Sequence, residues 1–121
     1  MENKVEIGRK GEMIATKYLL DKDYFICDKN WHYSHYEIDI VARKNNEIVF
    51  IEVKTRKPSD FEEPEDAVDL KKIKRLVVAA DNYIKLNNIS LQPRFDIIAI
   101  IINGEDYKLK HIEDAFYPPL C

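Results

Sequence analysis

The chain has 121 residues, of which 45% are hydrophobic and 34% charged, and this balance predicts one soluble domain, 1–121, with its own core. The net charge of −3 argues against a protein that binds nucleic acid through overall positive charge. No run approaches the roughly 18 apolar residues of a membrane span, and Met1-Glu2-Asn3-Lys4 begins no signal stretch, so we expect a cytoplasmic protein without a membrane partner.

Apolar residues at helical spacing predict a first helix over residues 7–20, and a short strand follows over 24–27. Residues 30–36 are polar and aromatic, which predicts a loop or an irregular strand. Cys27 and Cys121 have no cysteine or histidine partner at metal-site spacing, and cytosolic thiols stay reduced, so we expect no disulfide.

Two runs rich in β-branched residues, 37–43 and 48–54, predict a β-hairpin. Asn45-Asn46 between them tolerates the positive φ of a type I′ turn. If these two residues form the turn, Asp39 lies directly opposite Glu52, with the Cβ atoms about 4.5–5.5 Å apart. Two like charges at that distance repel each other, and a divalent cation would offset the repulsion.

The same register separates the two faces of the hairpin. One face is wholly apolar and is expected in the core; its members are Ile38, Ile40, Ala42, Val49, Ile51 and Val53. The other face is expected to carry Asp39 and Glu52 together with Val41, Ile48 and Phe50. Glu37 and Lys54 extend this second face towards the open end of the hairpin.

The second half of the chain begins with an acidic segment, 60–66, which predicts a loop. A second helix is predicted over 65–86. Its inward stripe is expected to consist of Ala67, Leu70, Ile73, Val77, Ala80 and Ile84. The apolar run 95–102 predicts a strand covered on both faces, and 107–112 alternates as a last strand would. This order of elements predicts the α/β class, a mixed β-sheet flanked by helices.

The carboxylates that converge on the hairpin predict a metal site there. Mg²⁺, or Mn²⁺ in its place, takes one or two carboxylates and keeps several waters, which matches Asp39 and Glu52. Glu12 on the first helix would join as a third carboxylate if that helix packs over the open end of the hairpin. We expect Lys54 to act electrostatically, because adjacent carboxylates favour its charged form although burial opposes it.

Other kinds of site are less well supported by the sequence. The three glycines form no phosphate loop, and no serine stands in a nucleophile elbow. The three histidines, His32, His35 and His111, have no thiolate partners for a zinc site. Basic residues that follow the hairpin and open the second helix would contact nucleic acid, namely Lys54, Arg56, Lys72 and Arg75.

Asp39 and the run Glu52-Val53-Lys54 resemble the signature of the PD-(D/E)XK nuclease superfamily, although Ile38 stands where a proline often precedes the first aspartate. The resemblance implies a restriction-endonuclease-like core, with Asp39, Glu52 and Lys54 as catalytic residues. It also implies that Glu12 completes the metal site. Lys72 would be the assisting helix lysine, with Lys71 as the alternative.

A longer ordered set narrows the resemblance to the YraN-like uncharacterised protein family. The set is Gly8-Arg9-Lys10-Gly11-Glu12, Glu37-Ile38-Asp39, Phe50-Ile51-Glu52-Val53-Lys54-Thr55-Arg56 and Arg94-Phe95-Asp96. The family resembles Holliday-junction resolvases in its core, which implies a structured DNA substrate, with DNA favoured over RNA. A homodimer is left open.

Two functions remain after this comparison. The favoured one is a metal-dependent nuclease, since a pure binder gains nothing from a repulsive carboxylate pair. The alternative is a non-catalytic nucleic-acid-binding or protein-interaction module on the same fold, which the acidic composition favours. In a third, purely structural interpretation, Lys54 only neutralises Glu37 or Glu52 across the hairpin.

Overall fold

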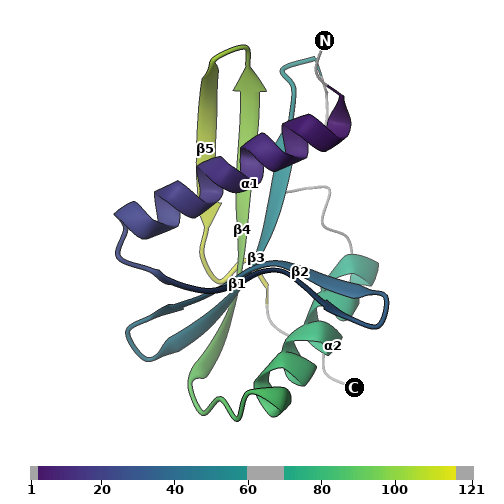
Figure 1. Ribbon diagram of the computed structural model, residues 1–121, viewed down its shortest axis with the longest axis vertical. Coiled ribbons are helices and arrows are strands. Elements are labelled where there is room, and N and C mark those ends of the chain that lie inside the picture. The colour runs from purple at the N-terminus through teal and green to yellow at the C-terminus, as the bar shows by residue number, and fades with distance from the viewer. Residues whose placement is uncertain (1–2, 60–69, 117–121) are drawn as a thin grey trace.

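The computed structural model describes residues 3–59 and 70–116. Within these residues two helices flank one five-stranded mixed sheet, in the spatial order β1-β2-β3-β4-β5 (Figure 1). The elements are α1 (Lys4–Asp21), β1 (Phe25–Tyr33), β2 (Tyr36–Lys44), β3 (Glu47–Arg56), α2 (Leu70–Leu86), β4 (Gln92–Asn103) and β5 (Asp106–Ile112). The predicted α/β class is confirmed, and the arrangement is compatible with a restriction-endonuclease-like core.

The strands combine two kinds of pairing. β1, β2 and β3 form an antiparallel meander, and β4 pairs antiparallel with β5. β3 and β4 are parallel, and the connection between them contains α2, because parallel neighbours need a crossover. The sheet is strongly twisted, so that β4 and β5 run across the direction of β1 and β2 (Figure 1).

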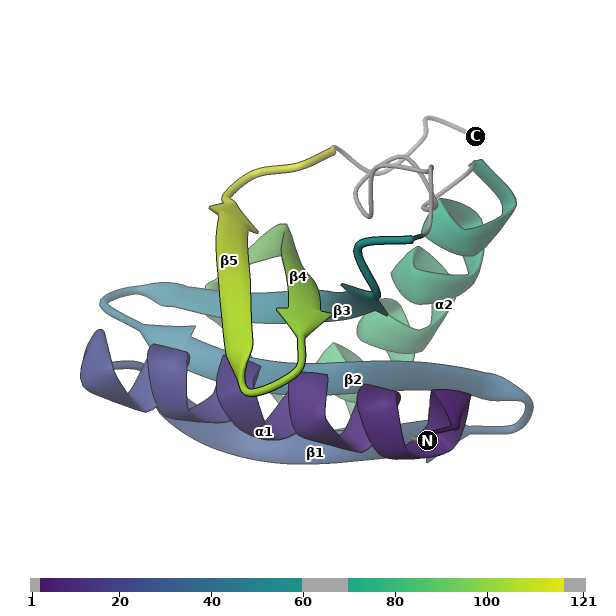
Figure 2. The same ribbon diagram turned by 90° about the horizontal axis from the view of Figure 1, so that it is seen from above.

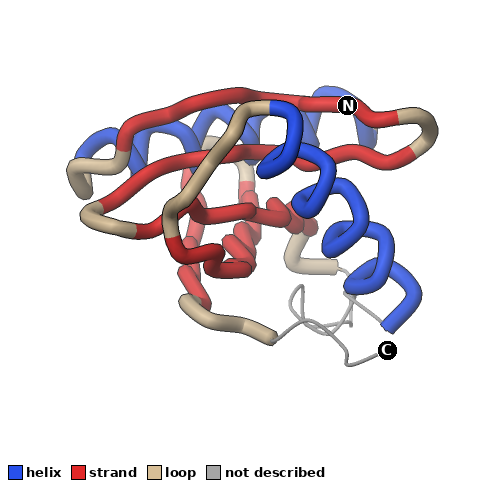
Figure 3. The backbone as a smooth tube through the Cα atoms, turned by 90° about the horizontal axis from the view of Figure 1, so that it is seen from below, coloured by secondary structure: helices blue, strands red, loops and turns tan. Residues whose placement is uncertain are grey.

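The two helices cover opposite faces of the sheet (Figures 2 and 3). α1 packs on a cluster that includes Ile40, Ile51 and Ile98, whereas α2 packs on a second cluster around Phe50. The central strands therefore carry apolar side chains on both faces, as predicted for the run 95–102. Neither helix within the described ranges is long and apolar enough to cross a membrane.

The sequence-based boundaries hold for the first helix, the hairpin and the last two strands, but not for β1. This strand continues to Tyr33, through most of the segment expected as a loop or an irregular strand, and turns at Ser34 and His35 into β2. The acidic segment 60–66 and the predicted start of the second helix lie outside the described residues. Cys27 is a free, half-buried thiol, and Cys121 also lies outside the described residues.

The predicted inward stripe of the second helix is confirmed in part, because Ala80 is buried and Val77 and Ile84 pack against the cluster around Phe50. Ala67 lies outside the described residues. Leu70 is exposed, and the buried side chains of α2 are Leu76, Ala79, Ala80 and Tyr83. Tyr83 lies inward because its hydroxyl donates a 2.6 Å hydrogen bond to Asp28 on β1. This polar contact satisfies the phenol hydroxyl.

Candidate functional site

A groove of about 870 Å³ lies between the N-terminal half of α1, the β1–β2 hairpin and the end of β3. Its acidic lining residues are Glu12, Glu37 and Asp39, and its basic ones include Lys54 and Arg56. The groove thus brings carboxylates and cations from three elements to one place. Such a mixture suits a cation together with an anionic substrate.

The predicted hairpin register is confirmed, since Lys44 pairs with Glu47 and Ile40 pairs with Ile51 around the turn at Asn45, whose φ is 55°. Beyond Ile40 the predicted faces are wrong. Ile38 packs in the α2-side cluster, although Ile40 packs on the α1 side. The alternation of side chains therefore breaks at Asp39, between these two isoleucines.

The cause lies in the neighbouring strand. Asn30 of β1 has a φ of 51° and lies between the pairs Lys29–Ile40 and Trp31–Ile38, so it faces Asp39. A left-handed residue within a strand rotates the backbone locally, and a short polar asparagine tolerates this conformation. As a result Asp39 lines the groove beside α1 instead of joining Val41 and Phe50 on the α2 side.

The carboxylates of Asp39 and Glu52 interact directly. Asp39 is half-buried, and its Oδ2 accepts a 2.8 Å hydrogen bond from the Val53 N–H. Burial and the negative charge of Glu52 raise the pKa of Asp39 to about 8, which the Val53 N–H offsets only in part. Each carboxylate therefore disfavours the negative charge of the other, and Asp39 holds its proton to a higher pH than a free aspartate does.

Lys54 neutralises the other carboxylate of this pair. Its Nζ lies 3.1 Å from Oε1 of Glu52, and the two side chains are only 12% and 20% exposed. Burial lowers the pKa of Lys54, but contacts with Lys72, Glu52 and Asp39 outweigh burial and leave the pKa above its ordinary value. Lys54 is therefore a cation at neutral pH, which agrees with an electrostatic role.

The contact between Lys54 and Lys72 brings α2 into the site. Lys72 lies in the first turn of α2 as the structure describes it, and its side chain contacts that of Lys54. The structure thus brings Lys72 to Lys54, and the assignment of Lys72 or Lys71 as the helix lysine of the site stays a prediction.

Glu12 lines the same groove, but its Oε1 accepts a 2.6 Å hydrogen bond from Asn30 Nδ2. In residues 3–59 and 70–116 no group of three or more Asp, Glu, His or Cys side chains is arranged to hold a metal ion. Glu12 is therefore near Asp39 and Glu52 without forming one ligand set with them. The three-carboxylate metal site stays a prediction.

Gly11 explains why α1 can approach the site so closely. A Cβ at this position would lie 2.0 Å from Thr55 Oγ1 and 2.9 Å from Thr55 Cβ. Only a residue without a side chain allows this contact between helix and strand. Since Thr55 follows Lys54, the contact sets the distance between Glu12 and the hairpin.

The predicted nucleic-acid contacts divide into two groups. Arg56 lines the groove, and its Nη1 donates a 3.0 Å hydrogen bond to the Thr55 carbonyl. Arg75 lies exposed on α2 and does not line the groove. Lys72 reaches the site through Lys54, so Arg56 and Lys72 are closer to the carboxylates than Arg75 is.

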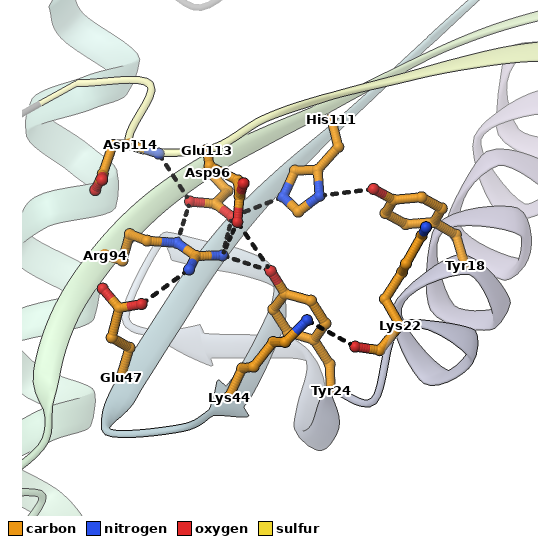
Figure 4. Close-up of polar contacts among 10 residues, drawn as sticks. All are labelled: Tyr18, Lys22, Tyr24, Lys44, Glu47, Arg94, Asp96, His111, Glu113 and Asp114. Atoms are coloured by element: carbon orange, nitrogen blue, oxygen red, sulfur yellow. Dashed lines mark hydrogen bonds and ion pairs between the residues drawn. The ribbon is translucent and has the colours of Figure 1, made fainter.

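A second polar cluster, which sequence analysis noted only as part of a family motif, lies inside the sheet around Asp96 (Figure 4). Arg94 donates from Nε and Nη2 to the two oxygens of Asp96 at 2.9 and 2.7 Å, and from Nη1 to Glu47 at 2.9 Å. The available signal was two opposite charges, two residues apart, at the start of an otherwise apolar strand.

Asp96 is fully buried and also contacts His111 Nε2 at 2.7 Å and the Asp114 N–H at 3.2 Å. The other nitrogen of His111 lies 3.0 Å from the Tyr18 hydroxyl of α1 (Figure 4). Burial raises the pKa of Asp96, but hydrogen bonds from His111 and Arg94 outweigh burial and lower it. This cluster ties α1 to β4 and β5 and does not line the groove.

Comparison with known proteins places the chain in a family. Residues 11–100 match the profile of the Uncharacterised protein family UPF0102. This chain belongs to that family. It is 51% identical to a UPF0102 protein of Bacteroides thetaiotaomicron over 115 residues, which is 95% of either chain. It is 47% identical to a UPF0102 protein of Parabacteroides distasonis over 98% of either chain, and 43% identical to one of Christiangramia forsetii over 93% of this chain and 94% of the other. The resemblance to the YraN-like family is thereby confirmed.

Proposed function

We propose that this UPF0102 protein is a metal-dependent nuclease that hydrolyses phosphodiester bonds in nucleic acid, with DNA favoured over RNA. The observation that carries the proposal is that Asp39 and Lys54 line one groove, with the ammonium group of Lys54 3.1 Å from Glu52 and the charge of Glu52 acting on Asp39. Arg56 lines the same groove. Phosphodiester hydrolysis requires carboxylates for a cation and positive charge for the phosphate, and this groove supplies both.

The residues present fit a divalent metal ion. Burial and Glu52 disfavour the negative charge of Asp39, and a bound cation would favour it. Mg²⁺ and Mn²⁺ prefer oxygen ligands, and Mg²⁺ is commonly held by one or two carboxylates and waters. Asp39 and Glu52 would hold the ion, and Glu12 would join them from α1.

Each remaining residue has a role that follows from its charge and position. A bound divalent ion would lower the pKa of its water and stabilise charge on a phosphoryl oxygen. Lys54, half-buried and charged, would stabilise negative charge that develops on the phosphate. Arg56 at the groove and Lys72 beside Lys54 would hold the flanking phosphates.

A non-catalytic binding module on the same fold is the second candidate. The observation in its favour is that Lys54 already neutralises Glu52, while Glu12 is hydrogen-bonded to Asn30. The net charge of −3 fits a protein partner better than a nucleic acid. The two candidates differ in whether the protein cleaves nucleic acid and whether that cleavage depends on the carboxylates.

The deciding experiment tests cleavage of single-stranded, duplex and branched DNA and RNA with Mg²⁺ or Mn²⁺. Wild type should cleave at least one substrate, and EDTA should abolish the activity. Glu52→Gln keeps the size of the side chain but removes the charge, so it should cleave nothing while retaining the fold. Lys108→Ala, an exposed residue of β5, is the matched control and should cleave as wild type does.

Lys54→Ala adds a kinetic criterion. It should lower the rate at saturating substrate more than it lowers affinity, since the proposed role is in the transition state. Cleavage that persists in the Glu52→Gln variant, and in wild-type protein with EDTA, would rule out this groove as the site of hydrolysis. Wild-type protein that binds the substrates but cleaves none would support the binding module.

A further inference from the structure

The tip of the β1–β2 hairpin gathers aromatic side chains from both strands. The rings of Trp31 and Tyr33 are nearly parallel, with centroids 6.3 Å apart and 10° between their planes. Tyr33 pairs with Tyr36 across the turn, and directly opposed residues share one face of a sheet. His35 covers Tyr36 with a centroid distance of 4.3 Å.

These rings contribute differently to the fold. Trp31 meets Tyr83 of α2 edge-on at 5.1 Å, and both Trp31 and Tyr36 pack against the α2-side core. Tyr33 is the outer ring of the stack and is 40% exposed. Trp31 therefore holds the orientation of Tyr33, whose ring remains accessible for a flat partner.

The tip is adjacent to the groove. The same hairpin supplies the groove residues Asn30, Glu37 and Asp39, and its turn lies beyond the N-terminal end of α1 (Figure 2). Tyr36, the cross-strand partner of Tyr33, precedes Asp39 by three residues, which is roughly 10 Å along a strand. Lys54 and Arg56 line the groove on the α1 side, whereas Trp31 and the Tyr33 ring stacked on it lie on the α2 side of the same hairpin. A nucleic acid held in the groove therefore reaches Tyr33 only where an unpaired base turns around the tip.

We propose that Tyr33 stacks on an unpaired base, and that the substrate of the groove is a nucleic acid with a single-stranded segment next to the scissile phosphate. The inference rests on the proposed function, because it takes the groove as the nucleic-acid site. An aromatic ring stacks on the face of any base that is free of a duplex, so this contact selects single-stranded structure without selecting sequence. In a continuous duplex both faces of each internal base are already stacked, and Tyr33 gains no partner.

The test measures binding to wild-type protein in EDTA, where metal-dependent cleavage does not interfere. The probes are a fluorescein-labelled oligo(dT) of about 15 nucleotides and a blunt duplex of equal length, at low salt. Tyr33→Leu keeps an apolar side chain but removes the flat ring, and should weaken oligo(dT) binding roughly 5- to 150-fold. Duplex binding by Tyr33→Leu should stay within about twofold of wild type, because no base face is available to Tyr33.

Two further variants separate stacking from folding. Tyr33→Phe retains the ring and should bind oligo(dT) as wild type does. Phe25→Leu changes an aromatic residue that is 67% exposed at the opposite end of the same strand, and should leave binding unchanged. Thermal melting of each variant excludes a loss of fold.

The outcomes distinguish this inference from the proposed function. If Tyr33→Leu binds oligo(dT) as tightly as wild type, or if wild type binds neither probe, the stacking proposal is overturned. Metal-dependent cleavage together with Tyr33-independent binding overturns the stacking role and leaves the nuclease standing. Tyr33-dependent binding without cleavage supports the stacking role and removes the nuclease.

Discussion

At the scale of single residues, the carboxyl group of Asp39 carries most of the cost of the candidate site to the stability of the folded protein. Burial and Glu52 raise its pKa, so the folded protein retains a proton that the unfolded chain releases above a pKa of about 3.9. Folding is therefore disfavoured increasingly as the pH rises from the unfolded value towards about 8. A site that lowers the stability of the apo protein in this way is typical of function.

Asp39→Asn should consequently raise the melting temperature at neutral pH in EDTA, because asparagine retains an acceptor for the Val53 N–H without the charge. Wild type should gain stability from millimolar Mg²⁺ or Mn²⁺, since a ligand bound only by the folded state stabilises it. The variant should lose most of that gain. Differential scanning fluorimetry with and without EDTA measures both effects, and a wild-type melting curve indifferent to metal would contradict the metal site.

At the scale of elements, the packing of α1 on β3 decides where Glu12 lies. Gly11→Ala introduces a Cβ within 2.9 Å of Thr55 Cβ, so rotation of the threonine alone cannot relieve the clash and α1 must move. Such overpacking costs about 1–3 kcal/mol in the free energy of unfolding. Urea denaturation measures this loss.

Gly8→Ala is the matched control in the same helix. No atom lies within 4 Å of the added Cβ, so the change should stabilise the protein by up to about 1 kcal/mol through helix propensity. Equal effects of the two substitutions would show that helix propensity, and not contact with Thr55, governs this helix.

The buried cluster on β4 and β5 predicts a specific dependence on acid. Its hydrogen bonds keep Asp96 charged to a lower pH than in the unfolded chain, so the contribution to stability is present above a pH of about 3.9 and is lost as the pH falls through the folded pKa. Asp96→Asn removes the fully buried counter-charge of Arg94 and leaves it the more exposed Glu47 and Glu113, so the loss should be up to about 3–5 kcal/mol at neutral pH.

The difference between Asp96→Asn and wild type should be smaller at a pH of about 3 than at neutral pH, because below about 3.9 the unfolded wild-type chain takes up a proton that the folded carboxyl binds less readily. Urea denaturation at both pH values measures the change. Asp106→Asn, at an exposed position of β5, serves as the control and should alter stability little. A loss that is equal at neutral and acid pH would mean that shape, not charge, holds the cluster.

These elements show how far the sequence predicts this molecule. Period-2 alternation and Asn45-Asn46 predict the hairpin and its register correctly, because local turn geometry sets them. The face of Ile38 is not predictable in this way, since a left-handed residue in another strand, Asn30, determines it. The contact of Tyr83 with Asp28 and the cluster around Asp96 likewise depend on tertiary contacts between distant residues.

At the scale of the whole molecule, the distribution of charge matters more than its sum. The protein has a net charge of −3, yet Lys4, Lys54 and Arg56 line the groove and Lys72 reaches its edge at Lys54. A protein of this composition can bind nucleic acid only where its cations are gathered, so binding should depend strongly on ionic strength. The groove should therefore account for most of the salt dependence.

The corresponding prediction concerns affinity for duplex DNA measured by anisotropy across a range of salt. Each phosphate contact should weaken binding by about 0.9 log units per tenfold increase in salt, because it releases condensed counterions. Arg56→Ala removes one proposed contact and should lower this slope by about that amount, whereas Lys108→Ala, exposed on β5, should leave it unchanged. Binding that does not change with salt, or a slope that Lys108→Ala lowers as much as Arg56→Ala does, would mean that the groove does not hold the phosphates. The acidic surface would then favour a protein partner over a nucleic acid.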